Sequence, residues 1–235
     1  MASSVPILLV PGLLCSARLY APQIPALWPF GPVAVADHRR DADMAAIAAR
    51  ILKDAPPRFA LAGLSMGGYI ALAMLRLAPE RIAQLALLDT SARPDLPEQQ
   101  AGREKFIAMA EAGKLADVVE LLTPKFLHRS RHNDEALKRV VRDMAAETGA
   151  EAFVRQQQAI MTRPDSRPLL ASIRCPTLML VGDGDELTPP ELAKEIAGGI
   201  SGARLVVVPE CGHLSTLEKP EAVNAALADW LTFNN

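Results

Sequence analysis

At 235 residues the chain has the length of one domain, and half of its residues are hydrophobic, so it can bury a substantial core. The net charge is −2 with mixed signs along the chain, which argues against a nucleic-acid footprint or a polybasic membrane surface. No basic region with a long apolar segment follows Met1, so neither a signal peptide nor a membrane span is predicted, and we expect a cytoplasmic protein. The three cysteines are far apart and lack metal-type spacing, which is typical of free thiols.

Strands and helices alternate in the first part of the chain. Apolar runs predict strands at 5–10, 32–36, 58–62 and 82–88. Helices are predicted at 18–28, interrupted by Pro22 and Pro25, and at 41–54 and 69–78. Near-continuous apolar strands that alternate with helices are typical of a parallel sheet covered on both faces. The sequence therefore predicts an α/β fold.

The pattern changes after Thr90. Strand-like runs disappear between 91 and 170, and helical patterns follow near 97–112, 115–122, 134–148 and 150–161. Alternation then resumes, with strands expected at 177–181 and 205–208 and helices at 190–198 and 220–231. We interpret the chain as a single domain, with a core formed by 1–90 and 171–235 and a helical cap, 91–170, inserted over the sheet.

The stretch from Phe59 to Tyr69 contains Gly63-Leu64-Ser65-Met66-Gly67 between a predicted strand and a predicted helix. This is the context in which Gly-x-Ser-x-Gly forms a nucleophile elbow. A serine pinched between strand and helix is held in a strained conformation, and this requires residues without bulk two positions before and after it. The motif predicts that Ser65 is a nucleophile, exposed at the sheet edge at the positive end of a helix.

A serine hydroxyl needs a base in contact with it, and the base needs an orienting group. His213 follows the last predicted strand and is the candidate base, whereas His38, His128 and His132 are expected to be surface or core residues. Three carboxylates compete for the third role. Asp185 is favoured because its loop is long enough to reach the histidine; Asp89, which follows the strand after the elbow, and Asp183, which suits turn closure, are the alternatives.

With these features in place, the chain resembles the α/β-hydrolase superfamily, and within it a subgroup of capped bacterial serine hydrolases. The matching segments are Val10-Pro11-Gly12-Leu13-Leu14-Cys15, Gly63 to Tyr69, Leu87-Leu88-Asp89-Thr90, Cys175-Pro176-Thr177 and Cys211-Gly212-His213. The resemblance implies that Ser65 is the nucleophile, His213 the base and Asp185 the acid, with the backbone N–H groups of Leu13 and Met66 as the oxyanion hole. It implies no cofactor and no metal.

Two departures from the family pattern are visible. Only four residues precede the first strand, which looks like the family's third, so we predict a trimmed sheet of about six parallel strands without the usual N-terminal hairpin. In addition, Pro11-Gly12 stands where many relatives have His-Gly, so a polar group that can brace the oxyanion loop is missing.

The resemblance implies acyl transfer, and the favoured activity is hydrolysis of a small to medium, fairly apolar carboxylic ester. C–C bond hydrolysis, cofactor-free perhydrolysis and hydroxynitrile lysis use the same triad and remain alternatives, as does a non-catalytic ligand receptor. Serine at the elbow argues against haloalkane dehalogenase and epoxide hydrolase chemistry. Candidate pocket residues are Leu14, Asp89, Phe126, Gln157 and Met161.

Overall fold

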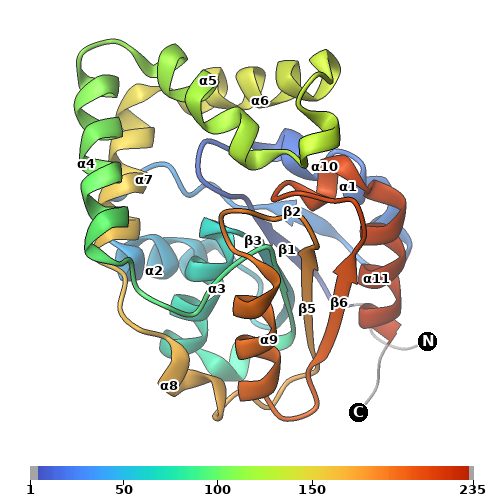
Figure 1. The fold of residues 1–235 in the computed structure, drawn as a ribbon. Coiled ribbons are helices and arrows are strands. Elements are labelled where there is room, and N and C mark those ends of the chain that lie inside the picture. The colour runs from blue at the N-terminus through green and yellow to red at the C-terminus, as the bar shows by residue number, and fades with distance from the viewer. Residues whose placement is uncertain (1–4, 233–235) are drawn as a thin grey trace.

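Six parallel strands form the centre of the computed structural model, which describes residues 5–232 (Figure 1). The strands are β1 (Ile7–Val10), β2 (Val33–Val35), β3 (Phe59–Leu64), β4 (Ile82–Leu88), β5 (Thr177–Gly182) and β6 (Arg204–Val208). Their order in the sheet is β2-β1-β3-β4-β5-β6, and every neighbouring pair is parallel. The predicted six-stranded parallel sheet is thereby confirmed; residues 1–4, where no leader was predicted, lie outside the described part.

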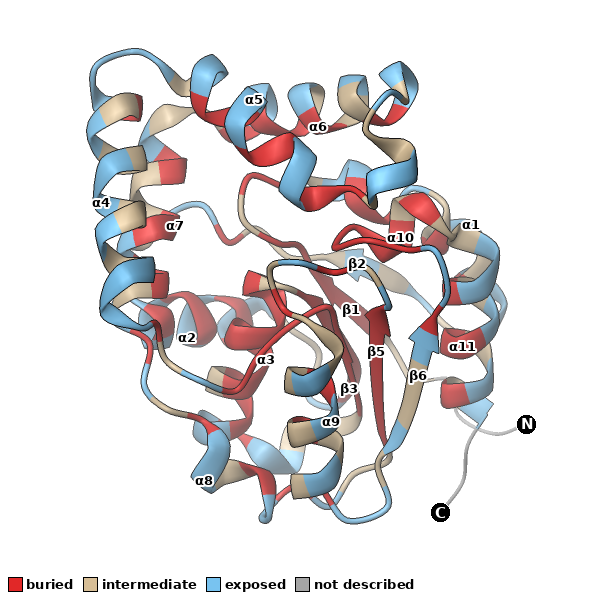
Figure 2. Cartoon of the chain, in the orientation of Figure 1, coloured by how far each residue is buried: buried red, intermediate tan, exposed pale blue. Residues whose placement is uncertain are grey.

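Helices cover both faces of this sheet, so β1, β3 and β5 are buried along their whole length (Figure 2). On one face lie α2 (Met44–Asp54), α3 (Met66–Leu77) and α9 (Pro190–Gly199), which share a hydrophobic cluster with one set of strand side chains. On the other face α1 (Gln23–Leu27) and α11 (Pro220–Thr232) pack against the alternate set. Burial on two sides explains why the strands read as continuous apolar runs.

Five helices lie between β4 and β5: α4 (Pro97–Glu111), α5 (Leu115–Phe126), α6 (Glu135–Thr148), α7 (Ala150–Met161) and the short α8 (Arg167–Leu170). The first four form two packed pairs, α4 with α7 and α5 with α6, and α5 and α6 lie above the carboxyl ends of the strands (Figure 1). α8 instead contacts α9 of the core. The assignment of 91–170 as a cap remains a prediction.

The predicted helix at 18–28 is interrupted, as expected, although the breaks differ from those predicted. The structure has a 3-10 turn at Ala17–Tyr20, then α1, then a second 3-10 turn at Trp28–Phe30. Pro22 and Pro29 explain the division, because each lacks the N–H that a continuous helix requires, whereas Pro25 is accommodated in the first turn of α1. The short α10 (Ser215–Glu218) was not predicted.

Within residues 5–232, no helix has the length and apolar character needed to cross a bilayer.

Candidate active site

Ser65 lies in the turn between β3 and α3, with φ 56° and ψ −116°. Such a conformation is costly for a residue with a side chain and persists only where its surroundings enforce it. Two glycines permit it: a Cβ on Gly63 would lie 2.2 Å from the carbonyl oxygen of Gly67, and one on Gly67 would lie 2.0 Å from that of Val10. The Thr90 hydroxyl also donates to the Ser65 carbonyl at 2.8 Å. The turn has the geometry expected of a nucleophile elbow.

The structure brings Ser65, His213 and Asp185 into one hydrogen-bonded chain, although they come from three separate loops. His213 Nε2 lies 2.8 Å from Ser65 Oγ, and His213 Nδ1 lies 2.8 Å from Asp185 Oδ2. Asp185 also accepts from the backbone N–H groups of Leu187 and Thr188 and from the Thr188 hydroxyl, at 2.7–3.0 Å. A carboxylate with this many donors is held in one orientation.

The two alternative carboxylates are engaged elsewhere. Asp183 accepts from the N–H of Cys211 at 3.2 Å, so its hydrogen bond goes to the histidine loop and not to its own turn, contrary to the prediction. Asp89 is fully buried, and it accepts from the N–H of Gly182 and from the hydroxyl of Ser215. Burial and the neighbouring charge of Asp185 raise the pKa of Asp89 well above its usual value, which favours its protonated form. The geometry therefore favours Asp185 over both.

Charge and burial act in opposite directions on the His213–Asp185 pair. Burial lowers the pKa of His213, but the charge of Asp185 and the hydrogen bond to it outweigh burial, so that the pKa lies above its ordinary 6.5. Burial likewise raises the pKa of Asp185, but the charge of His213 and the bonds that Asp185 accepts bring it below its usual value. The pair thus stabilises an imidazolium facing Ser65, as a general base requires.

The histidine loop is fastened to the end of α5. The carbonyl of Phe126 accepts the N–H of His213 at 3.0 Å, and the Phe126 ring stacks on the imidazole with 6.1 Å between centroids. Glu218 is 3% exposed, and its carboxylate accepts the N–H groups of Gly212 and His128 at 3.0 and 2.8 Å. Glu218 therefore connects the histidine loop to the insertion, a contact that was not predicted from the sequence.

The two predicted oxyanion donors flank the elbow. Met66 is the first residue of the twelve-residue α3, and Leu13 lies in the loop after β1. Within residues 5–232, neither the N–H of Met66 nor that of Leu13 donates a hydrogen bond to a protein acceptor. Unused donors at a helix N-terminus attract negative charge.

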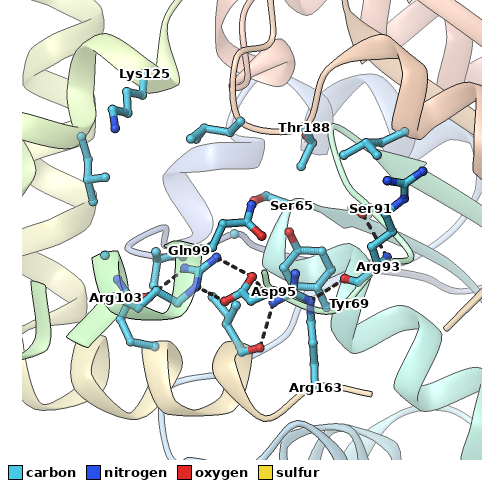
Figure 3. Close-up of a pocket in the computed structure, with 18 of the residues that line it drawn as sticks. Ser65, Tyr69, Ser91, Arg93, Asp95, Gln99, Arg103, Lys125, Arg163 and Thr188 are labelled. Carbon is cyan, nitrogen blue, oxygen red and sulfur yellow. Dashed lines mark hydrogen bonds and ion pairs between the residues drawn. The ribbon is translucent and has the colours of Figure 1, made fainter. Parts of the chain in front are cut away.

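A cavity of about 710 Å³ opens above Ser65 (Figure 3). Phe126 and Gln157 line it, as predicted, and Leu13 lines it too. Leu14, Asp89 and Met161 do not line it, so three of the five pocket predictions need correction. The side chains of Leu14 and Asp89 are buried in the core. Met161 is the last residue of α7, where its carbonyl accepts from the side chain of Gln100 on α4.

One wall of the cavity is charged (Figure 3). Asp95 accepts from Arg103 and from Arg163, whose Nη1 lies 2.7 Å from the carboxylate, and Arg163 also lies over the Tyr69 ring at 4.2 Å. Two guanidinium groups share one carboxylate, so one positive charge is left over in this group. Lys125 lines the same cavity and makes no ion pair within the described residues.

Sequence reasoning missed Gln156, which is fully buried beside the loop that carries Leu13. A signal was present. Gln156 follows Phe153 by three positions and precedes Ile160 by four, so it shares their buried helix face, where a polar side chain needs a hydrogen-bond partner.

Among residues 5–232, no group of three or more metal-ligating side chains occurs.

Comparison with known proteins matches residues 6–226 to the alpha/beta hydrolase family. A pimeloyl-[acyl-carrier protein] methyl ester esterase from Neisseria meningitidis is 28% identical over 221 residues, which cover 89% of this chain and 85% of the relative. A thermophilic esterase from Thermogutta terrifontis, solved with malate bound, superimposes with a TM-score of 0.88 at 32% identity, covering 97% of this chain and 89% of the other. An enol-lactonase from Burkholderia xenovorans gives a TM-score of 0.89 at 25% identity, covering 99% and 93%.

Proposed function

This chain belongs to the alpha/beta hydrolase family, and we propose that it hydrolyses carboxylic esters through Ser65, His213 and Asp185. The observation that carries the proposal is the pair of 2.8 Å contacts that connects a strained serine, a buried imidazole and a buried carboxylate beneath a cavity. A serine hydroxyl is activated when a base accepts its proton and a third group holds that base.

The reaction proceeds by acyl transfer. His213 Nδ1–H donates to Asp185, which leaves Nε2 free to accept the Ser65 proton as Oγ attacks the ester carbonyl. The protonated imidazole then gives its proton to the leaving alcohol, and Ser65 keeps the acyl group. Water repeats the sequence on the acyl-enzyme, which releases the carboxylic acid and restores the serine.

The N–H groups of Leu13 and Met66 serve as donors to the tetrahedral oxyanion. Both are unused by other acceptors among the described residues, and α3 adds the positive end of its dipole. Each well-placed donor contributes roughly 3–4 kcal/mol to lowering the barrier. Helices of the 91–170 insertion act as the cap, since Phe106, Phe126 and Gln157 contribute to the walls around Ser65.

The cavity suits an ester of medium size with a polar or anionic far end. Leu13, Phe126 and Leu187 provide apolar surface. The buried part of the charged wall, Arg103 with Arg163 and Asp95, has an excess positive charge, while Glu98 and Glu186 line more exposed parts of the cavity. An excess buried cation is stabilised by an anion. The malate bound to the Thermogutta esterase is in keeping with such a ligand.

Hydrolysis of p-nitrophenyl esters from acetate to decanoate tests the proposal, with the wild type, Ser65→Ala and the exposed control Ser172→Ala assayed together. We expect Ser65→Ala to abolish turnover above the spontaneous rate and Ser172→Ala to leave it unchanged. Equal rates for wild type and Ser65→Ala, or a folded wild type that hydrolyses none of the esters, would contradict the proposal.

A further inference from the structure

The loop that carries Leu13 is a tight turn with an unusual conformation. The N–H of Cys15 donates to the carbonyl of Gly12 at 3.1 Å, which closes a β-turn with Leu13 and Leu14 at its centre. Leu14 has a φ of 59°, while Leu13 has no positive φ. A positive φ at the third position alone is the signature of a type II turn, where glycine or asparagine is the usual residue. A leucine there is strained.

One side chain from the insertion contacts the central peptide of this turn. Gln156, in the middle of α7, is 0% exposed, and its Oε1 accepts the N–H of Leu14 at 3.1 Å. The backbone N–H is only a donor, so it fixes the orientation of the amide: the oxygen faces Leu14 and the nitrogen lies 3.0 Å from His38 Nε2.

His38 completes a buried group around the turn. Its Nε2 lies 2.9 Å from the carbonyl oxygen of Gly12, and the side chain is 2% exposed. Burial lowers the pKa of His38 to about 4, so the ring is neutral near pH 7. In one tautomer the ring donates to Gly12, and in the other it accepts from Gln156. In both, it keeps the turn and the amide packed together.

The hydrogen bond between Gln156 and the Leu14 N–H matters because type I and type II turns differ in the orientation of the central peptide, to which this N–H belongs. Type I and type II turns are related by a flip of the central peptide, here the one between Leu13 and Leu14. A leucine at the third position favours type I, since the left-handed conformation costs about 1–2 kcal/mol. After a flip, the Leu13 carbonyl oxygen instead of the Leu14 N–H would face Gln156 Oε1. To avoid two facing oxygens, the amide would have to turn over, which would place its oxygen on His38 Nε2 and break the contact that the amide nitrogen makes there.

We propose that Gln156 is a positioning residue for the oxyanion hole: through its contacts with the Leu14 N–H and with His38, which lies against the Gly12 carbonyl, it holds the type II turn and with it the Gly12–Leu13 peptide that carries the Leu13 N–H. The proposal rests on the proposed function. It gives the insertion a role in the chemistry in addition to covering the cavity, because Gln156 on α7 accepts the Leu14 N–H. It also identifies a polar brace for the loop in a chain that has proline at position 11.

The test separates oxyanion binding from ordinary ligand binding. We would measure the affinity of wild type and variants for a trifluoromethyl ketone, which forms a tetrahedral oxyanion on the serine, and for the matching secondary alcohol, which does not. Gln156→Met keeps the size of the side chain but removes the acceptor. We expect ketone affinity and kcat to fall roughly 10–100-fold, with alcohol affinity and KM within about threefold of wild type.

Three further variants complete the design. Gln156→Asn is too short to retain the bond but is equally polar, so it replaces Gln156→Met if that variant does not fold, and the same loss is expected. Gln156→Glu keeps an acceptor for the Leu14 N–H and is expected to restore most of kcat. Gln158→Met, at an exposed position on the same helix, is the matched control and should behave as wild type.

Unchanged kcat and ketone affinity in Gln156→Met or Gln156→Asn would overturn the inference. So would an equal loss of ketone and alcohol affinity, which indicates general damage to the pocket. If Ser65→Ala still hydrolyses esters, the proposed function itself is wrong. If Ser65→Ala is inactive while the Gln156 variants behave as wild type, only the inference fails.

Discussion

Replacing Asp185 by asparagine preserves the shape of the site and reverses one hydrogen bond. The asparagine oxygen keeps the N–H donors of Leu187 and Thr188, because a backbone N–H accepts no hydrogen bond. The amide nitrogen must then face His213 Nδ1, where the carboxylate oxygen lies 2.8 Å away in the wild type. Nδ1 becomes an acceptor, so the proton moves to Nε2. His213 then donates to Ser65 and cannot accept its proton.

The magnitude follows from this wrong tautomer. In a triad, the same loss lowers kcat by about 10⁴-fold, equivalent to roughly 5.5 kcal/mol in the barrier. The charge that raises the pKa of His213 is also removed, and burial, which lowers that pKa, is left unopposed. We therefore expect kcat for p-nitrophenyl butyrate to fall by three to four orders of magnitude. In a pH–rate profile, the residual activity should decline on the acidic side at a lower pH than the activity of the wild type does, because the pKa of His213 is lower.

Two isosteric variants serve as controls in stopped-flow and steady-state assays of the same ester. Asp183→Asn keeps an oxygen for the N–H of Cys211 and should retain kcat within a few-fold. Asp89→Asn tests the alternative acid, and it should retain most activity because the Asp89 carboxyl group bonds to Gly182 and Ser215 and not to His213. The reasoning fails if Asp185→Asn retains more than a tenth of kcat, or if Asp89→Asn is the variant that loses activity.

Three other outcomes are expected. The kcat/KM of the wild type should rise with pH through a pKa above 6.5, because His213 must be neutral to accept a proton and its pKa is raised; a limb below pH 6 in a pH–rate profile would contradict this. Arg103→Met should lower kcat/KM for mono-p-nitrophenyl adipate roughly tenfold and leave p-nitrophenyl hexanoate unchanged, whereas equal effects would argue against an anionic substrate end. Gly67→Ala should lose about 3 kcal/mol in urea unfolding, because its Cβ would lie 2.0 Å from the Val10 carbonyl oxygen, and a stability equal to wild type would show that the elbow is not this tightly packed.

The parallel sheet and the assembly of the triad follow from features that are visible in the sequence. Strands buried on both faces read as apolar runs, and parallel strands place their carboxyl ends at one edge. Ser65, Asp185 and His213 each follow a predicted strand, so the sequence could indicate that they meet. Choosing Asp185 over Asp89 was harder, because both follow strands at that edge. Only the donors around each carboxylate separate them.

The parts that the sequence did not predict depend on side-chain direction or on distant contacts. Leu14 was expected in the pocket because it follows Leu13, but its positive φ directs the chain so that its side chain is buried. Gln156 and Leu14 are 142 positions apart, and no local pattern joins them. Glu218 likewise bridges the histidine loop and the insertion. Such contacts arise only once the helices are packed over the sheet.

The claim that acyl transfer passes through Ser65 is tested most directly by trapping the intermediate. The protein would be mixed with p-nitrophenyl acetate, quenched in acid within the first turnover and analysed by peptide mass spectrometry. We predict one acetyl group per chain, located on the peptide that contains Ser65, and no adduct in Ser65→Ala. Turnover with the acetyl group on another residue, or with no adduct at all, would contradict the account.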